Sequence, residues 1–209
     1  DGIARVSSKV LAGKVVTMSV DWEHIPAKHR SLIKAFLDEA DMSADAIKTV
    51  DFPPVYGVDI VVSCEKAKDP KNGSIYLKPT QFVLGIGCRR DTAFENIDRA
   101  IRQSLLKLQI DISDIDMIAS IDVKKDEPGI KEFCERNRIE FVTYTADELM
   151  AVQGEFSASQ FVREHVGVDN VCERAAVLAC SRECNKAGEL IYEKHKYDSV
   201  TVAAARYPD

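Results

Sequence analysis

The 209-residue sequence has no long apolar run, no concentrated positive charge and no secretory signal pattern. Its longest uninterrupted apolar run, Ala175 to Cys180, is far shorter than the roughly 20 residues that a membrane-spanning helix needs. No Lys/Arg cluster exceeds two consecutive residues, and the net charge is −6 with a pI near 5.3. Nucleic-acid binding requires a concentrated positive face. We therefore expect neither a membrane nor a nucleic-acid partner, and we expect a cytoplasmic protein or a fragment of one.

Cysteine and histidine are present, but not at the spacings of metal-binding motifs. None of the six cysteines forms a CxxC pair, and the four histidines show no HxxxH or HExxH spacing, so we expect no metal site. Cys180 and Cys184 lie one helical turn apart and could bind a metal or oxidise together, but we expect them to pack as small hydrophobes. Cys88 beside Arg89 could have a lowered thiol pKa and act as a nucleophile, although a packed cysteine is commoner at a strand end.

Residues 1–80 are expected to form a smaller α+β region. Alternating apolar residues predict a strand over 15–20, and apolar residues at helical spacing predict a helix over 25–40. Two further strands, over 57–64 and 74–78, are separated by a turn at 67–73 that contains proline, asparagine and glycine, which favours a hairpin. A short break at 78–81 marks the expected domain boundary.

From residue 81 to 209, strands alternate with helices, which predicts an α/β fold, a three-layer α/β/α domain with a mixed sheet. Thr92 and Thr145 each precede a glutamate by three residues, a pattern that predicts two capping boxes at helix starts. Pro128 suits the first turn of another helix, and Gly167 suits a helix end. The predicted strands cover residues 82–86, 117–121, 140–144, 189–194 and 200–205.

Polar residues follow the first of these strands, at the place where α/β sheets bind ligands. In the segment GIGCRRDT, Gly85 and Gly87 would let the backbone approach a ligand, and Arg89 and Arg90 offer forks for carboxylates. A helix start at Thr92 would add unpaired N–H donors. The pattern favours an anion site, and a plain tight turn with solvated arginines is the alternative.

Two further loops carry charge. Residues 122–129 hold two lysines and three carboxylates, which suits either acid–base work or a solvated helix cap. The third loop begins at Ser157 and leads into a nearly apolar helix with Glu173 in its first turn. Glu173 is either a partly buried functional group or a residue that stabilises the helix dipole.

The order of these motifs resembles one family. The segments GIGCRRDT, ASIDVKKDEPGI, FSASQFVREHVGVDNVCERAAVLA and GELIYEKHKYDSVTVAAAR resemble, in order and distance, the C-terminal domain of the cobalamin-biosynthesis protein G family (CbiG), and also the stand-alone protein CobE. The resemblance covers residues 81–209. Residues 3–14 are similar to the segment after the family's first domain. The resemblance therefore implies that residues 1–80 correspond to the family's central region, and we expect the family's first domain to be missing from this sequence. Asp91 departs from the family pattern by adding a negative charge beside the expected anion site.

The resemblance implies a hydrolase of the anaerobic route to cobalamin (vitamin B12). The family's reaction opens the δ-lactone of cobalt-precorrin-5A with water and releases acetaldehyde, giving cobalt-precorrin-5B. The substrate is a small-molecule corrinoid that brings its own cobalt, so no resident cofactor is implied. The sequence leaves open whether the chain forms a homodimer. The alternatives are a corrinoid-binding or carrier module without its own catalysis, and an unrelated α/β interaction domain.

The candidate site residues are hypotheses, because the resemblance supplies no established catalytic set. Arg89 and Lys125 would bind acetate or propionate groups of the macrocycle, since a few focused cations can hold a polyanion on an acidic protein. Backbone N–H groups around Gly87 and Cys88 would stabilise the oxyanion, and Glu127 or Glu173 would take the proton from water. The expected binding residues are Gly85, Gly87, Cys88, Arg89, Arg90, Thr92, Lys125 and Ser159.

Overall fold

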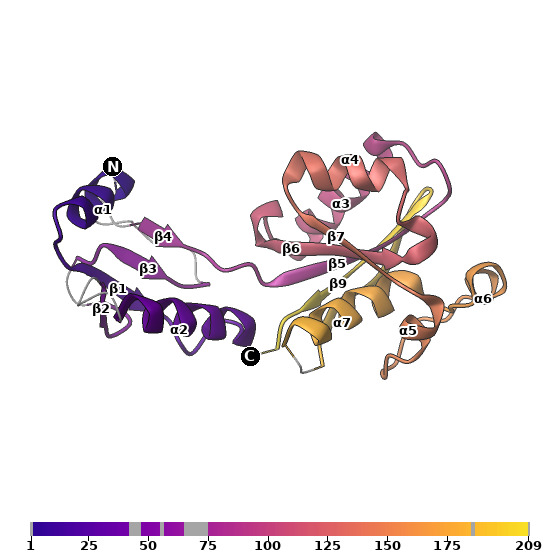
Figure 1. Cartoon of the computed structure of the whole chain (residues 1–209). Helices are drawn as coiled ribbons and strands as arrows, with labels where there is room; N and C mark the ends of the chain where they lie inside the picture. The colour runs from indigo at the N-terminus through magenta and orange to yellow at the C-terminus, as the bar shows by residue number, and fades with distance from the viewer. Residues whose placement is uncertain (1, 42–46, 55–56, 65–74, 185–186, 209) are drawn as a thin grey trace. The chain divides into compact units, whose positions relative to one another are not determined.

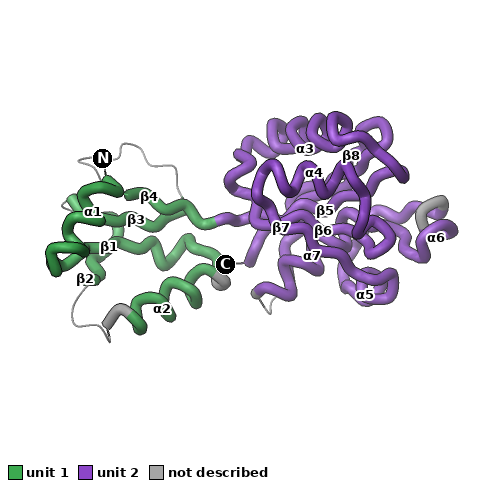
Figure 2. Tube along the Cα trace, turned by 45° about the horizontal axis from the view of Figure 1, so that its top comes forward, with its two compact units in different colours: residues 1–79, 209 green, residues 80–208 purple. Residues whose placement is uncertain are grey.

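The chain forms two compact units in a computed structural model that describes residues 2–41, 47–54, 57–64, 75–184 and 187–208. Unit 1 comprises residues 1–79 and unit 2 residues 80–208 (Figure 2). No helix in the described parts is long and apolar enough to cross a membrane. Each unit has its own sheet and its own hydrophobic core, and each is described separately below.

Unit 1 is built on four parallel strands in the order β2-β1-β3-β4. Its core packs Met18, Val20 and Val62 from the sheet against Ile25, which precedes α2. The elements are α1 (Gly2–Leu11), β1 (Val16–Val20), α2 (Ala27–Asp41), β2 (Ile47–Val50), β3 (Ile60–Val62) and β4 (Ile75–Leu77) (Figure 1).

The parallel pairing of β3 with β4 shows that the expected hairpin is wrong. Parallel neighbours cannot be joined by a tight turn and need a crossover connection. The turn expected at 67–73 lies outside the described residues. A fully parallel sheet is closer to an α/β arrangement than to the α+β arrangement expected for this region. The sequence patterns also gave no prediction for α1 or β2.

A buried carboxylate holds α1 against the sheet of unit 1. Asp59, only 1% exposed, accepts hydrogen bonds from Lys9 Nζ at 2.8 Å and from the backbone N–H and hydroxyl of Thr17. Arg5 adds an ion pair at 3.3 Å. Burial opposes ionisation of Asp59, but the hydrogen bonds from Lys9 and Thr17 outweigh it and lower the pKa of the carboxyl.

Unit 2 is a three-layer α/β/α domain, which confirms the fold predicted for it. Its mixed sheet has the order β7-β6-β5-β9-β8, with β5, β6 and β7 parallel to one another and β9 antiparallel to both β5 and β8. The strands are β5 (Phe82–Cys88), β6 (Ile115–Ile121), β7 (Glu140–Tyr144), β8 (Glu189–Tyr197) and β9 (Val200–Arg206). The α-helices are α3 (Phe94–Leu108), α4 (Pro128–Asn137), α5 (Ala146–Met150), α6 (Gln160–Val166) and α7 (Val171–Cys184).

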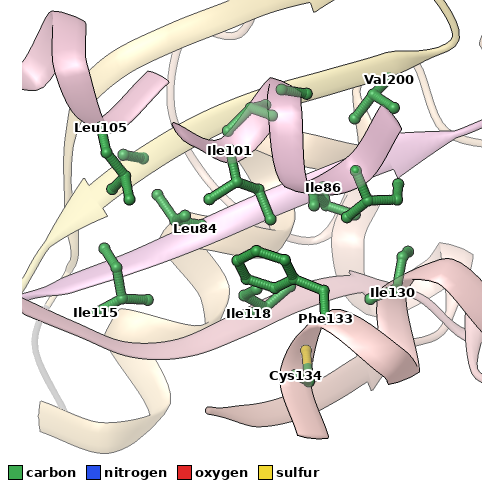
Figure 3. Close-up of a cluster of buried hydrophobic side chains, with 14 of the residues drawn as sticks. Leu84, Ile86, Ile101, Leu105, Ile115, Ile118, Ile130, Phe133, Cys134 and Val200 are labelled. Carbon is green, nitrogen blue, oxygen red and sulfur yellow. The ribbon is translucent and has the colours of Figure 1, made fainter. Parts of the chain in front are cut away.

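The two faces of this sheet carry different helices. Alternation along β5 points Leu84 and Ile86 toward α3 and α4, where they meet Ile101, Ile130 and Phe133 (Figure 3). The other face, with Val83, Met117 and Ala119 among its residues, packs on the alanine-rich α7. Burial of both faces explains why the central strands read as nearly continuous apolar runs.

Local signals placed several helix ends correctly. Thr145 and Glu148 form the predicted capping box at the start of α5, Pro128 begins α4, and Gly167 ends α6 in a left-handed conformation. The capping box predicted at Thr92 is wrong: the N-cap of α3 is Ala93, and the Thr92 hydroxyl donates instead to the carbonyl of Arg89 at 2.7 Å.

Candidate functional site

The first two predicted loops meet at the carboxyl ends of β5 and β6. The backbone N–H of Thr92 donates to Glu127 Oε1 at 3.0 Å, and Lys124 Nζ donates to Glu127 Oε2 at 2.7 Å. The backbones also touch, because a Cβ added at Gly129 would stand 2.2 Å from the carbonyl oxygen of Thr92. The segments 88–92 and 122–129 therefore form one continuous surface, which we call the paired loops.

Three cations on the paired loops are exposed. Within the described parts of the chain, the side chains of Arg89, Arg90 and Lys125 make no hydrogen bond or ion pair with the protein. Lys124 differs from them because it is committed to Glu127 and its side chain is only 13% exposed. The paired loops thus present guanidinium and ammonium groups that remain available to an anion. Asp91, exposed and at a positive φ of 57°, adds one negative charge to the same surface.

The two glycines expected to line the anion site lie within β5, which runs on to Cys88. Gly85 pairs with Ala119 and Ala203, and a Cβ there would stand 1.7 Å from the carbonyl oxygen of Cys172, so its small size admits α7 rather than a ligand. Gly87 pairs with Thr201, whose hydroxyl donates to the Gly87 carbonyl at 3.2 Å. The oxyanion role of the N–H groups near Gly87 and Cys88 stays a prediction.

Both carboxylates predicted to activate water accept hydrogen bonds from the chain itself. Glu127 is 6% exposed and bridges the paired loops. Glu173 is fully buried and accepts from the Ser157 backbone N–H at 2.9 Å, the Ser157 hydroxyl at 2.8 Å and the Lys194 backbone N–H at 2.6 Å. Through these hydrogen bonds each glutamate joins separate segments of the chain. Their role as general base stays a prediction.

The third loop lies beside α7, on the other face of the sheet from α4. Arg174 on α7 holds it through a forked ion pair to Asp169, with N–O distances of 2.7 and 3.1 Å. The hydrogen bond from Arg174 lowers the pKa of Asp169 against the effect of burial. Ser159 is the N-cap residue of α6 and borders an open pocket that contains no residue of the paired loops; its lining is Ala158, Ser159, Gln160, Arg163, Glu164 and Asp169. The first two predicted loops are thus joined by side-chain and backbone contacts. The third segment meets the first where the Cys172 carbonyl packs on Gly85.

Comparison with known proteins places this sheet and its loops in a family. The family described as cobalamin synthesis G C-terminus matches residues 82–205, more than half of the chain and nearly all of unit 2. The chain belongs to this family.

Relatives and solved structures extend the comparison. The chain is 35% identical over 126 residues to the cobalt-precorrin-5A hydrolase of Salmonella typhimurium, a match that covers 60% of this chain and 34% of the relative. The matched part thus spans about a third of that relative's length. CobE, a protein from the cobalamin biosynthetic pathway, is 26% identical with a TM-score of 0.57, covering 60% of this chain and 89% of CobE. A cobalamin biosynthesis protein G homolog from Sulfolobus solfataricus is 20% identical with a TM-score of 0.50, covering 99% of this chain and 55% of the homolog, and shares the fold.

The cysteine on the paired loops of this family member is protonated near neutral pH. Burial raises the pKa of the Cys88 thiol to about 11, although the nearby Lys124 ammonium lowers it. Because the thiolate is the nucleophile, this pKa argues against the nucleophilic role considered for Cys88. In the described residues, no three His, Cys, Asp or Glu side chains gather as a metal site requires. The side chain of Cys184 lies outside the described set, so its pairing with Cys180 stays open.

Sequence reasoning missed one arrangement of polar side chains in unit 1. Asp21 lies directly after β1 and is 2% exposed, and it contacts both His24 and Ser63. Asp21 and Ser63 each follow the last residue of a strand, which was the available signal. The signal went unused because the neighbouring positions of β1 and β3 depend on a parallel pairing that the sequence pattern did not predict.

Proposed function

We propose that this chain takes part in cobalamin biosynthesis, binding cobalt-precorrin-5A at the paired loops and taking part in its hydrolysis to cobalt-precorrin-5B. The observation that carries the proposal is the trio Arg89, Arg90 and Lys125, exposed on two loops that contact each other. The substrate's acetate and propionate groups are ligands that guanidinium and ammonium groups recognise. The cobalt ion belongs to the substrate. The cytoplasmic location and the absence of a nucleic-acid partner that we expect from the sequence are part of the same proposal.

A titration of the chain with cobalt-precorrin-5A, followed by absorbance, tests the binding step. Arg89→Glu should weaken binding roughly 10- to 150-fold, because a hydrogen bond to a charged group contributes about 1.5 to 3 kcal/mol. Arg138→Glu is the matched control, because it changes the charge by the same amount as Arg89→Glu. Arg138 is exposed and lies at the opposite end of α4 from the paired loops. Equal affinity of the Arg89 and Arg138 variants would remove the paired loops from the substrate site.

Acetaldehyde release tests the hydrolytic step separately. The expected product can be followed through oxidation of NADH by added alcohol dehydrogenase. Pigment binding with acetaldehyde release supports the hydrolase. Binding without release supports the second candidate, a corrinoid-binding or carrier module. This candidate is favoured by the likeness to CobE and by the hydrogen bonds that Glu127 and Glu173 already accept from the chain itself. Sedimentation of the same samples would decide whether the chain forms a homodimer.

A further inference from the structure

The paired loops carry carboxylates as well as cations. Two of their acidic residues are paired within the chain, since Lys124 lies 2.7 Å from Glu127 and Lys131 lies 3.6 Å from Asp126. Within the described part of the chain, the remaining charged side chains of the paired loops are exposed and make no hydrogen bond or ion pair with the protein; they are Arg89, Arg90, Lys125, Asp91 and Asp122. Three cations and two carboxylates leave a surplus of one positive charge, so a bound anion is attracted and repelled on the same surface.

Asp91 is the carboxylate next to the two arginines. It directly follows Arg89 and Arg90, and consecutive Cα atoms are only about 3.8 Å apart. The next residue, Thr92, is held at two atoms: its hydroxyl donates to the Arg89 carbonyl at 2.7 Å, and its N–H donates to Glu127 at 3.0 Å. The course of this turn is therefore fixed. An anion held by the guanidinium groups lies within the roughly 10 Å over which exposed charges interact in moderate salt.

The backbone at Asp91 does not require an acidic residue. Its φ of 57° is left-handed, a conformation that glycine adopts without steric cost and that aspartate tolerates better than most residues. The Asp91 side chain makes no hydrogen bond or ion pair with the described part of the chain that would explain a carboxylate at this position. Its clear physical effect is on the charge of the surface that surrounds the arginines.

Opening of the lactone changes the charge of the pigment. Water adds its oxygen to the lactone carbonyl carbon and one hydrogen to the ring oxygen, and the acyl C–O bond breaks. The carboxylic acid that forms loses its remaining proton to solvent near neutral pH, because such acids have pKa values near about 4. Acetaldehyde leaves as a neutral molecule. The product consequently carries one carboxylate more than the lactone.

We propose that Asp91 is a specificity-determining residue, which makes the paired loops favour the lactone over the ring-opened product. This inference rests on the proposed function, because it takes cobalt-precorrin-5A as the ligand of the paired loops. The three cations attract the carboxylates that substrate and product share. Asp91 repels the additional carboxylate that the reaction creates, and the product therefore leaves more readily. Asp91 takes no proton in this scheme and is not a catalytic residue.

Asp91→Asn tests the proposal, because it removes the charge and keeps both the size of the side chain and its tolerance of a left-handed backbone. Stopped-flow absorbance gives the Kd of cobalt-precorrin-5A before turnover, and an equilibrium titration gives the Kd of cobalt-precorrin-5B. The ratio of product Kd to substrate Kd should fall about three- to tenfold at low salt, and the change should shrink at high salt. Asp91→Gly should give the same result, and glycine suits the backbone at this position.

Two other aspartates provide matched controls, since each Asp→Asn change removes one exposed carboxylate. Asp122 belongs to the paired loops, whereas Asp147 lies on α5. Asp122→Asn should tighten the binding of both pigments with little change in their ratio, and Asp147→Asn should leave both Kd values unchanged. A fall of the ratio in Asp122→Asn as large as that in Asp91→Asn would overturn the specific role of Asp91.

The outcomes separate this inference from the proposed function. If the chain binds cobalt-precorrin-5A and releases acetaldehyde, while Asp91→Asn keeps the wild-type ratio, the role of Asp91 is overturned and the proposed function stands. If the chain binds both pigments and releases no acetaldehyde, hydrolysis by this chain fails, yet a lowered ratio in Asp91→Asn still supports the role of Asp91. A chain that binds neither pigment overturns both proposals.

Discussion

The carbonyl oxygen of Cys172 lies so close to Gly85 that a Cβ at Gly85 would stand 1.7 Å from it. This contact seats the first turn of α7 directly on β5. Neither partner is a flexible side chain end, because one is the backbone of a central strand and the other a backbone carbonyl. The distance between α7 and the unit 2 sheet therefore depends on glycine, which has no side chain, at position 85.

Gly85→Ala should destabilise unit 2. The added methyl group forces a shift between α7 and β5, and overpacking of a core typically costs about 1 to 3 kcal/mol, occasionally more. Urea unfolding measures the change. Gly57→Ala is the control, because a Cβ at Gly57 meets no atom within 4 Å. Equal stability of the Gly85 variant and the wild type would show that the two layers can separate without cost.

Asp59 should make unit 1 sensitive to acid. Its pKa is lowered in the folded chain, so the carboxylate contributes stability above the ordinary aspartate pKa of about 3.9, and this contribution is lost as the pH falls from there through the folded pKa. The free energy of unfolding should thus decline below about pH 4, and Asp59→Asn should flatten that decline. Glu155→Gln, an exposed carboxyl-to-amide change, is the control. An unaltered pH profile in Asp59→Asn would contradict this assignment.

Glu173→Gln should affect stability more than chemistry. The amide NH₂ would face donors on one side, since both carboxylate oxygens accept from Ser157 or Lys194, and a buried group left unsatisfied costs about 1 to 3 kcal/mol. Urea unfolding should report this loss, while acetaldehyde release per folded molecule stays near the wild-type value. A collapse of the rate without loss of stability would instead support Glu173 as the general base.

The thiol of Cys88 should resist alkylation. With a pKa of about 11, it holds about 100-fold less thiolate at pH 8 than a thiol with a pKa of 9, and the greater nucleophilicity of the more basic thiolate recovers only part of that loss. We expect iodoacetamide to label Cys88 at least about tenfold more slowly in the folded chain than in urea, as read by peptide mass spectrometry. Lys124→Met should slow it further, because it removes a charge that lowers the pKa. Rapid labelling of folded Cys88 would revive its role as a nucleophile.

The features predicted from sequence are those that neighbouring residues determine. The strand Glu140–Tyr144 and the capping box of Thr145 and Glu148 were found because both depend on side chains a few positions apart. Thr92 shows the limit of that reasoning: it has the same spacing to a glutamate, yet its hydroxyl bonds back to Arg89 and its N–H is taken by Glu127, 35 residues away.

Long-range pairing was the part that sequence patterns did not determine. The turn-forming residues between β3 and β4 suggested a hairpin, but the strands run parallel. The same limitation hid the contact of Asp21 with Ser63, which are 42 positions apart and meet only because β1 pairs with β3. The contact between the loops after β5 and β6 was expected because both strands end at one edge of the sheet, but β5 extends through Cys88, and the role of Gly85 required knowledge of where α7 packs.

The hydrogen bond from Thr92 to Glu127 and the backbone contact of Thr92 with Gly129 link Arg89 and Lys125 mechanically. We therefore expect that a carboxylate bound by Arg89 would affect the position of Lys125 through these contacts. In the proposed substrate site the two cations would act together, so replacing both should change the binding free energy by an amount that differs from the sum of the single replacements.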